Sequence, residues 1–223
     1  MKRTVFLDRD GTINQIVAFP DLGLLDSPLN AEQFSLLPGA AEAIRIMNQL
    51  GLEVVVASNQ PSMAKGKMTL EAFETVRAKM REQLAIYGAH VDAEYYCFHH
   101  PSAKDAMYRV DCECRKPKPG LLLKAAEELD VNLSGSYVVG DSLTDVEAGR
   151  AVGCRTFMIG SLKCDLCRLM EEECVKPDLI VPSLFAAAKI IEKETRNGSN
   201  ARALKARPEA PRVLRSQDDT KGA

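Results

Sequence analysis

Two carboxylates follow an apolar run near the start of the chain. Residues 5–7 are Val-Phe-Leu, and the motif Asp8-Arg9-Asp10-Gly11 comes directly after them. Side chains two positions apart in an extended chain point to the same side, which predicts that Asp8 and Asp10 face one site. Two crowded carboxylates need a metal ion or a shared proton. Taken alone, the motif is also typical of a turn.

A second pair of carboxylates follows another apolar run. Residues 137–139, Tyr-Val-Val, precede Gly140, Asp141 and Asp145. Mg²⁺ is usually held by one or two carboxylates together with water and substrate phosphate, so Asp141 is a candidate ligand in the same site as Asp8. Asp145 has two interpretations, as a site carboxylate or as a cap of the helix expected after it.

Phosphate-binding side chains are indicated at two further places. Ser58, Asn59 and Gln60 follow the hydrophobic residues 54–57, and a hydroxyl and two amides suit hydrogen bonding to phosphate oxygens. The segment is also ordinary turn composition. Lys116 stands shortly before a helix predicted from Pro119, where a positive charge opposes the helix dipole. This unfavourable position makes Lys116 a candidate for neutralising phosphate.

Three thiols and one imidazole form a second constellation. Cys97 and His99 are followed, after twelve intervening residues, by Cys112 and Cys114. A Cys₃His set is a tetrahedral zinc combination that leaves no open position, so the predicted zinc is structural and staples the intervening loop. His100 is the competing ligand, although the Cys-x-His spacing favours His99.

The remaining cysteines give a weaker signal. The pair Cys164 and Cys167 has the spacing of a redox pair or a second metal site. No histidine or second paired motif accompanies it, so we interpret these residues, with Cys154 and Cys174, as ordinary thiols.

Alternating strands and helices are predicted to position all of these side chains. Helical patterns include one capped by Thr69, and one after Pro119 that directs Leu122 and Leu123 to the core. The alternation predicts an α/β fold, a three-layer α/β/α Rossmann-like arrangement around a mainly parallel sheet. Ligands in such folds sit at the carboxyl ends of strands. The predicted strands cover residues 4–7, 53–57, 94–97, 137–139, 155–159 and 178–181.

Two long connections and a tail complete the predicted organisation. Residues 14–37 and 103–113 are candidate loops over the site. Residues 1–191 are predicted to form one domain, and residues 192–223 a basic, disordered C-terminal tail. Neither connection is long enough for a full cap domain.

Composition restricts the classes of function. The chain has 223 residues, 46% of them hydrophobic, and a net charge of −2. No overall basic field favours nucleic acid, and no apolar run is long enough for a membrane span. No signal peptide is evident. Seven cysteines do not suit a complete disulfide framework. We expect a cytoplasmic monomer.

The four strand-end motifs together resemble the haloacid dehalogenase (HAD) phosphatase superfamily. The resemblance implies a phosphoric monoester hydrolase in which Asp8 is the nucleophile and Asp10 the general acid and base. It implies catalytic Mg²⁺ held by the side chains of Asp8 and Asp141 and by the backbone carbonyl of Asp10. Ser58 and Lys116 would neutralise the transferring phosphoryl group.

The zinc spacing narrows the resemblance to a subgroup without a large cap domain. This subgroup contains D-glycero-D-manno-heptose 1,7-bisphosphate 7-phosphatase and histidinol-phosphate phosphatase. The twelve-residue gap resembles the heptose enzymes and implies a sugar bisphosphate substrate in carbohydrate metabolism. Histidinol phosphate, another small phosphosugar, or a zinc-stabilised binding module without catalysis are the alternatives. The implied substrate-binding residues are Asp8, Arg9, Asp10, Ser58, Asn59, Gln60, Arg115 and Lys116, with Lys65 at the rim.

This sequence departs from the heptose pattern at three places. A long loop follows Thr12 in place of a short polar-aromatic one, Ser142 replaces a common lysine, and Pro61-Ser62-Met63 replaces a small segment. These positions leave the chemistry intact but alter the side of the pocket that would recognise the sugar.

Overall fold

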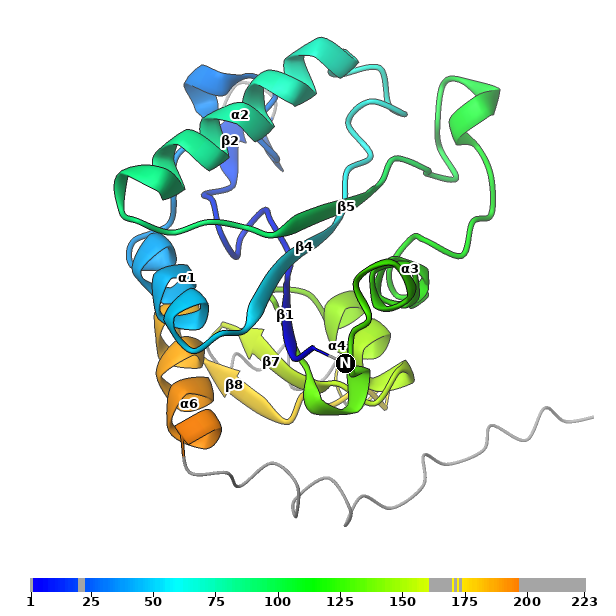
Figure 1. The fold of residues 1–223 in the computed structure, drawn as a ribbon. Coiled ribbons are helices and arrows are strands. Elements are labelled where there is room, and N and C mark those ends of the chain that lie inside the picture. The colour runs from blue at the N-terminus through cyan, green and yellow to red at the C-terminus, as the bar shows by residue number, and fades with distance from the viewer. Residues whose placement is uncertain (1, 20–22, 161–169, 171, 173, 197–223) are drawn as a thin grey trace, which may run out of the picture.

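A six-stranded parallel sheet forms the centre of the molecule. The computed structural model describes residues 2–19, 23–160, 170, 172 and 174–196. The strand order is β5-β4-β1-β6-β7-β8, with all neighbours parallel (Figure 1). The predicted parallel sheet is therefore confirmed. Its strands are β1 (Thr4–Leu7), β4 (Glu53–Asn59), β5 (Ala93–Cys97), β6 (Tyr137–Gly140), β7 (Arg155–Ile159) and β8 (Leu179–Val181).

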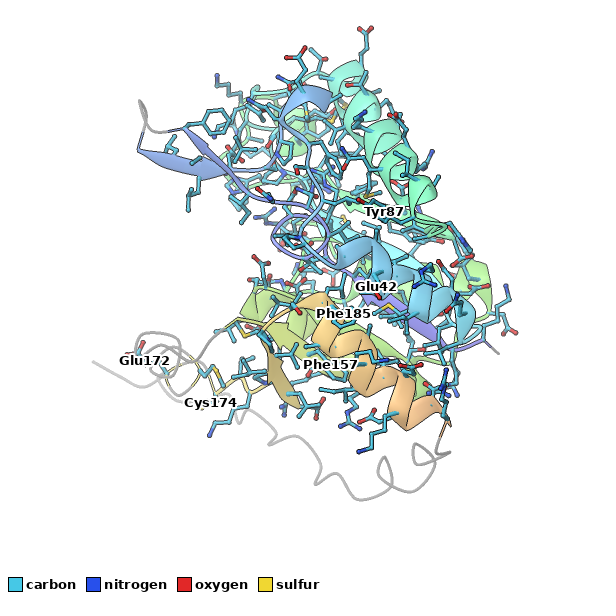
Figure 2. The ribbon with its side chains drawn as sticks, turned by 90° about the vertical axis from the view of Figure 1, so that its left-hand side faces the viewer. Glu42, Tyr87, Phe157, Glu172, Cys174 and Phe185 are labelled. Carbon is cyan, nitrogen blue, oxygen red and sulfur yellow. The ribbon has the colours of Figure 1, made fainter. Side chains whose placement is uncertain are left out.

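Helices cover both faces of this sheet, as the three-layer prediction requires. The side chains of β1 alternate between the faces: Val5 and Leu7 pack in one hydrophobic cluster, and Phe6 packs in the other. The first cluster includes residues of α1, α2 and α6, and the second includes residues of α3 and α4. In Figure 2, α1 and α6 lie side by side on the first face. The helices are α1 (Ala40–Gln49), α2 (Leu70–Ile86), α3 (Gly120–Leu129), α4 (Leu143–Ala151) and α6 (Leu184–Arg196).

The two helices predicted in detail form near the expected places. Thr69 caps α2 by accepting a hydrogen bond from the Ala72 N–H at 3.1 Å. The prediction for α3 is partly wrong in its register, because Leu123 is 49% exposed, while Leu121 and Leu122 are buried. Leu122, Ala125, Ala126 and Leu129 form the core-facing stripe at helical spacing, and Leu123 lies about 100° away from it around the helix axis.

The two long connections have structure of their own. Residues 14–37 contain an antiparallel hairpin, β2 (Val17–Phe19) and β3 (Leu24–Asp26), and a short 3₁₀ helix, Ala31–Gln33. Figure 2 shows this hairpin projecting at the end of the molecule opposite α6. The loop between β5 and α3 contains a second 3₁₀ helix, Ala106–Tyr108. A third, Leu133–Gly135, precedes β6.

The last described helix continues past the expected domain boundary. Helix α6 ends at Arg196, and Glu194 in its last turn pairs with Arg155 of β7 at 2.8 Å. The pair Cys164 and Cys167 and the tail after Arg196 lie outside the described residues. Among the described residues, no helix has the length and apolar character to cross a membrane.

Candidate active site

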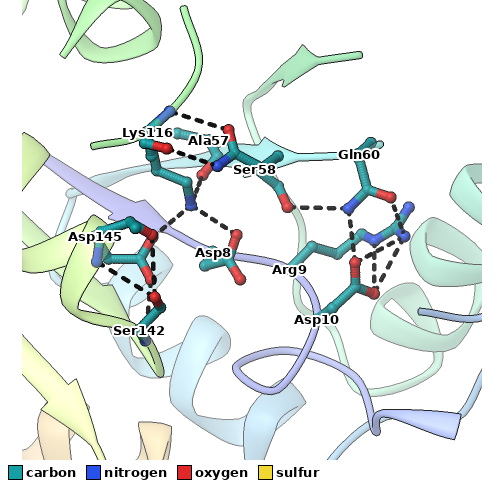
Figure 3. Close-up of polar contacts among 11 residues, drawn as sticks. Asp8, Arg9, Asp10, Ala57, Ser58, Gln60, Lys116, Ser142 and Asp145 are labelled. Carbon is teal, nitrogen blue, oxygen red and sulfur yellow. Dashed lines mark hydrogen bonds and ion pairs between the residues drawn. The ribbon is translucent and has the colours of Figure 1, made fainter. Parts of the chain in front are cut away.

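Strands β4, β1 and β6 are neighbours, and all three end at the same edge of the sheet. Parallel strands bring their carboxyl ends together, so Ser58, Asp8 and Asp141 meet although they lie far apart in sequence. Figure 3 shows the polar contacts around this edge. They form two groups, one around Asp8 and the other around Asp10.

Lys116 organises the first group (Figure 3). Its Nζ donates hydrogen bonds to Asp8 Oδ1 at 2.7 Å, to the Ala57 carbonyl at 2.8 Å and to Asp145 Oδ1. The side chain is 5% exposed. Its carboxylate partners outweigh the opposing effect of burial and raise the pKa of Lys116, so the ammonium stays charged. A cation thus lies beside the predicted nucleophile.

Three carboxylates converge next to this lysine. Asp8, Asp141 and Asp145 each present an oxygen, and these oxygens lie within 4.8 Å of one another. The structure brings together Asp8 and Asp141, as predicted for Mg²⁺. Burial, with repulsion from Asp8 and Asp145, raises the pKa of Asp141 to about 7. A hard, oxygen-only donor set with an unfavourable excess of negative charge fits a magnesium ion.

Two glycines make room for these carboxylates. Gly11 has φ +79°, and a Cβ built there would lie 2.1 Å from Asp141 Oδ2. A Cβ at Gly140 would lie 2.3 Å from the carboxylate of Asp145. Both positions therefore require glycine, the first because of its backbone conformation as well as its neighbour.

Asp145 serves in both ways that the sequence left open. It forms a capping box with Ser142 at the start of α4, and its other oxygen pairs with Lys116. Burial raises the pKa of Asp145 to about 6, against the opposing effect of Lys116. In the sequence, this capping box is indicated by the spacing Ser142-x-x-Asp145 directly after a buried strand.

Asp10 belongs to the second group. Its carboxylate accepts hydrogen bonds from the side chains of Arg9, Asn14 and Gln60, and it is not part of the three-carboxylate cluster. Asp8 and Asp10 therefore have different hydrogen-bond partners, because the chain leaves the extended conformation after Asp8. The backbone N–H groups of Ile13 and Asn14 return to the Arg9 carbonyl and form a tight turn.

The polar side chains at the end of β4, and Arg9 beside them, have distinct environments. The Ser58 hydroxyl accepts a hydrogen bond from Gln60 Nε2 at 3.0 Å, so its own O–H remains available to a ligand. Asn59 uses both ends of its amide on the backbone of Lys116. Arg9 is fully buried, with its guanidinium over the rings of Phe73 and Tyr96. Two of the predicted substrate-binding side chains, those of Asn59 and Arg9, thus bind other groups of the protein.

The predicted zinc ligands come together as one cluster. The three sulfurs of Cys97, Cys112 and Cys114 are 3.2–3.6 Å apart, and His99 Nδ1 lies 3.3 Å from Cys114 Sγ. Ligand atoms around tetrahedral zinc are roughly 3.5–3.8 Å apart, given Zn–S bonds of about 2.3 Å, so the cluster could hold zinc. His100 is outside the cluster, and its Nδ1 accepts the Ser102 N–H.

The cluster is directly linked to Lys116. Arg115, between Cys114 and Lys116, donates Nη1–H to the His99 carbonyl at 3.1 Å.

An open pocket of about 520 Å³ borders these residues. The nearby charges of Lys65 and Arg115, after the larger effect of burial, lower the pKa of His100. Arg109, Arg115 and Lys118 line this pocket together with Lys116, so most of its charged groups are cations. The pocket is lined by Pro101, Arg109, Val110, Asp111, Cys112, Arg115, Lys116, Pro117 and Lys118.

Comparison with known proteins gives consistent relatives. A family model described as HAD-hydrolase-like matches residues 113–187. The D-glycero-β-D-manno-heptose-1,7-bisphosphate 7-phosphatase of Escherichia coli K12 is 39% identical over 152 residues, which are 68% of this chain and 75% of that protein. The D,D-heptose 1,7-bisphosphate phosphatase of B. bronchiseptica, solved with magnesium and phosphate, is 31% identical with a TM-score of 0.70, covering 87% of this chain and 99% of that one. A HAD-like phosphatase of Mesorhizobium loti has a TM-score of 0.71 at 27% identity, covering 87% of each chain.

Proposed function

The chain belongs to the HAD-like hydrolase family that includes the heptose-1,7-bisphosphate 7-phosphatases, and we propose that Asp8 is the nucleophile with which it removes the 7-phosphate of such a sugar bisphosphate. The observation that carries this proposal is the contact of Lys116 with Asp8 beside Asp141 and Asp145. An ammonium at this point neutralises a phosphoryl oxygen and orients the carboxylate for attack.

The proposed reaction has two displacements at phosphorus. An oxygen of Asp8 attacks, the bond between phosphorus and the sugar oxygen breaks, and Asp10 gives its proton to the departing alkoxide. Water then attacks the aspartyl phosphate, Asp10 takes the proton from the water, and the bond between phosphorus and Asp8 breaks. Inorganic phosphate leaves, and Asp8 and Asp10 regain their starting states.

The protein's own groups hold the phosphoryl oxygens during both steps. Lys116 supplies a positive charge, and the Ser58 O–H can donate because its oxygen accepts from Gln60. We propose that Asp8 and Asp141 hold Mg²⁺ with the Asp10 carbonyl, and that Asp145 supports Lys116 from the other side. Bound Mg²⁺ would offset charge on the phosphate and the nucleophile.

We propose that the Cys97, His99, Cys112 and Cys114 cluster holds one structural zinc. All four positions of a tetrahedral ion are taken by protein ligands, which leaves none for water or substrate. The zinc would fix the loop that carries Arg115 and Lys116, and so position the phosphate site without entering the chemistry.

The second phosphate of the proposed substrate has a suitable environment. The pocket beside Lys116 is bordered by Arg115, Arg109 and Lys118. Of these, Lys118 is paired with Asp111 and Glu113, and Arg109 donates to the Ala103 carbonyl. Arg115 has one carbonyl partner and lies next to the catalytic lysine, so it is the residue that we assign to the distal phosphate or a nearby hydroxyl.

A substrate panel tests this proposal. Purified enzyme with Mg²⁺ is assayed on D-glycero-D-manno-heptose 1,7-bisphosphate, histidinol phosphate and other sugar phosphates, ranked by kcat/KM, because this ratio reports transition-state binding. We expect the heptose bisphosphate to rank first and Asp8→Asn to abolish hydrolysis of every substrate. A higher rank for histidinol phosphate would reject the substrate, and activity in Asp8→Asn would reject the nucleophile.

A further inference from the structure

The carboxylate of Asp10 lies among three side-chain donors, and none of the four is in contact with Lys116 through a described hydrogen bond. We propose that Asn14, together with Gln60 and Arg9, is a positioning residue that sets the direction in which Asp10 delivers its proton. The inference rests on the proposed function, because it assigns these residues to the general acid of that reaction.

The donors act on both carboxylate oxygens. Asn14 Nδ2 donates to Oδ1 at 2.9 Å, and Gln60 Nε2 donates to Oδ2 at 2.6 Å. Arg9 approaches both oxygens through Nη2, each at 3.1 Å. Contacts on both oxygens fix the rotation of the carboxyl group as well as its place, which a single contact would not do.

Gln60 connects the acid to the phosphate site. Its two amide hydrogens go to Asp10 and to the Ser58 hydroxyl, and its Oε1 accepts from Arg9 Nη2 at 2.7 Å. Every polar atom of this side chain is therefore used, and the amide has one orientation that satisfies them all. The distance between the phosphate-binding hydroxyl and the acid is consequently fixed by one rigid side chain.

Arg9 is held in place from outside the site. Its guanidinium is fully buried and lies over the rings of Phe73 and Tyr96, with centroid distances of 5.6 and 5.9 Å. These rings belong to α2 and β5, elements packed on the sheet. Arg9 therefore holds Asp10 at a fixed place relative to the hydrophobic core. Its guanidinium has little freedom to turn toward a substrate.

Asn14 has no role in any strand-end motif, and its placement needs an explanation. The residue is fully buried, its backbone closes the turn with Arg9 and Gly11, and its Nδ2 donates to Asp10 and to the Gln15 carbonyl. Within the part of the chain that the structure describes, no group donates a hydrogen bond to its buried Oδ1. The hydrogen bonds of this side chain are therefore all made by its donor end, which holds Asp10.

Proton delivery matters most when the leaving group is a poor one. A sugar alkoxide needs a proton as the phosphorus–oxygen bond breaks, whereas 4-nitrophenolate is stable enough to leave without one. A defect confined to the direction of Asp10 should therefore reduce kcat/KM for alkyl phosphates and spare kcat/KM for 4-nitrophenyl phosphate. This ratio reports only the steps up to release of the leaving group, and the later hydrolysis of the aspartyl phosphate, in which Asp10 is the base, is common to both substrates. A general loss of structure would reduce both.

Asn14→Ala provides the test, with benzyl phosphate and 4-nitrophenyl phosphate as the two substrates of similar shape. We expect kcat/KM on benzyl phosphate to fall about 10- to 100-fold and kcat/KM on 4-nitrophenyl phosphate to fall less than about threefold, because only the first substrate needs the proton from Asp10 for its leaving group. Asn14→Leu keeps about the same size and removes the donor without adding a charge next to Asp10, so it should behave in the same way if the alanine variant is too unstable.

Two controls separate this inference from a structural effect and from the proposed function. Asn48→Ala removes a comparable amide, which donates to the His90 carbonyl far from the site, and should leave the ratio of the two substrates unchanged. In an Asp10→Asn background, Asn14→Ala should cause no further loss on benzyl phosphate. Equal losses on both substrates, or an additive loss in the double variant, would overturn the positioning role. A wild-type enzyme inactive on both substrates and on the whole sugar phosphate panel would instead reject the phosphatase itself.

Discussion

The side-chain amide of Asn59 forms two hydrogen bonds with the backbone of Lys116. Nδ2 donates to the Lys116 carbonyl, and Oδ1 accepts the Lys116 N–H, each at 3.0 Å. Strand β4 therefore holds Lys116 through its main chain, while the side chain of the same lysine reaches Asp8. Residues 57 positions apart in sequence are fixed as one unit.

Asn59→Ala should release Lys116 from this unit. We expect a stability loss of about 1–3 kcal/mol, because two buried backbone groups lose their partner. A displacement of the ammonium should lower kcat by about tenfold or more. Asn59→Asp keeps the acceptor and loses the donor, so its kcat should lie between those of wild type and Asn59→Ala. Urea unfolding and steady-state kinetics measure both effects, and an unchanged kcat in Asn59→Ala would contradict the positioning of Lys116.

Lys116→Met should leave Asp8 and Asp145 buried without their cation. Removing one partner of a buried pair typically costs about 3–5 kcal/mol. The lysine's own pKa is raised, so its stabilisation is present throughout the ordinary pH range and would be lost only in strong alkali. In the variant, the two carboxylates ionise at a greater cost, so the stability deficit should grow from pH 5 to pH 8. Urea unfolding at both pH values tests this, and a deficit independent of pH would contradict it.

Mg²⁺ binding should depend on the ionisation of Asp141. Its pKa is about 7 in the folded protein and about 3.9 in an unfolded chain, so its contribution favours folding below pH 4 and is lost as the pH rises through 7. The metal-free protein should therefore lose stability between pH 4 and pH 7. The rise in Tm on adding Mg²⁺ should be small at pH 5.5 and larger at pH 8. Asp141→Asn should reduce both effects, and an unaltered pH dependence in this variant would disprove the assignment.

Removal of zinc should disorder the loop that carries Arg115 and Lys116. We expect about one zinc per chain by elemental analysis and its loss in Cys112→Ser, because a structural site contributes its binding energy to folding. Tm and kcat should both fall, since the Arg115 contact with the His99 carbonyl joins the cluster to the lysine. Cys154→Ser is the matched control, a buried thiol outside the cluster that donates to the Leu133 carbonyl. Undiminished zinc in Cys112→Ser would reject the ligand set.

The sheet and the meeting of its polar strand ends could be predicted because their causes are local. Buried β-branched runs such as 54–56 favour parallel strands, and the side chains that follow them must collect at one edge. The spacing of Cys97 and His99 likewise restricts the possible ligands to a small set. Each of these predictions depends on a short segment and a general rule.

The connections and the inner contacts could not be predicted in the same way. The hairpin within residues 14–37 has only three residues in each strand, too few for a periodic signal. The separation of Asp10 from Asp8 depends on a turn closed by Asn14 and on partners from β4. Three leucines in a row, Leu121 to Leu123, leave open which of them faces the core, and the packing of α3 on the sheet decides it. Tertiary contacts decide all three.

The ion pairs at the strand ends also imply an order in which the metal ion and the substrate bind. Asp8 and Asp145 pair with the Lys116 ammonium, and Asp141 lies beside them, so when all three carboxylates are ionised the group carries a net formal charge of −2. A phosphate dianion approaching this group would be repelled, and a divalent cation would cancel the excess. Substrate should therefore bind productively only after the cation, and substrate analogues should protect the enzyme poorly in the presence of a chelator. Because the buried lysine already cancels one of the three negative charges, a single divalent cation is enough to neutralise the remaining charge of −2.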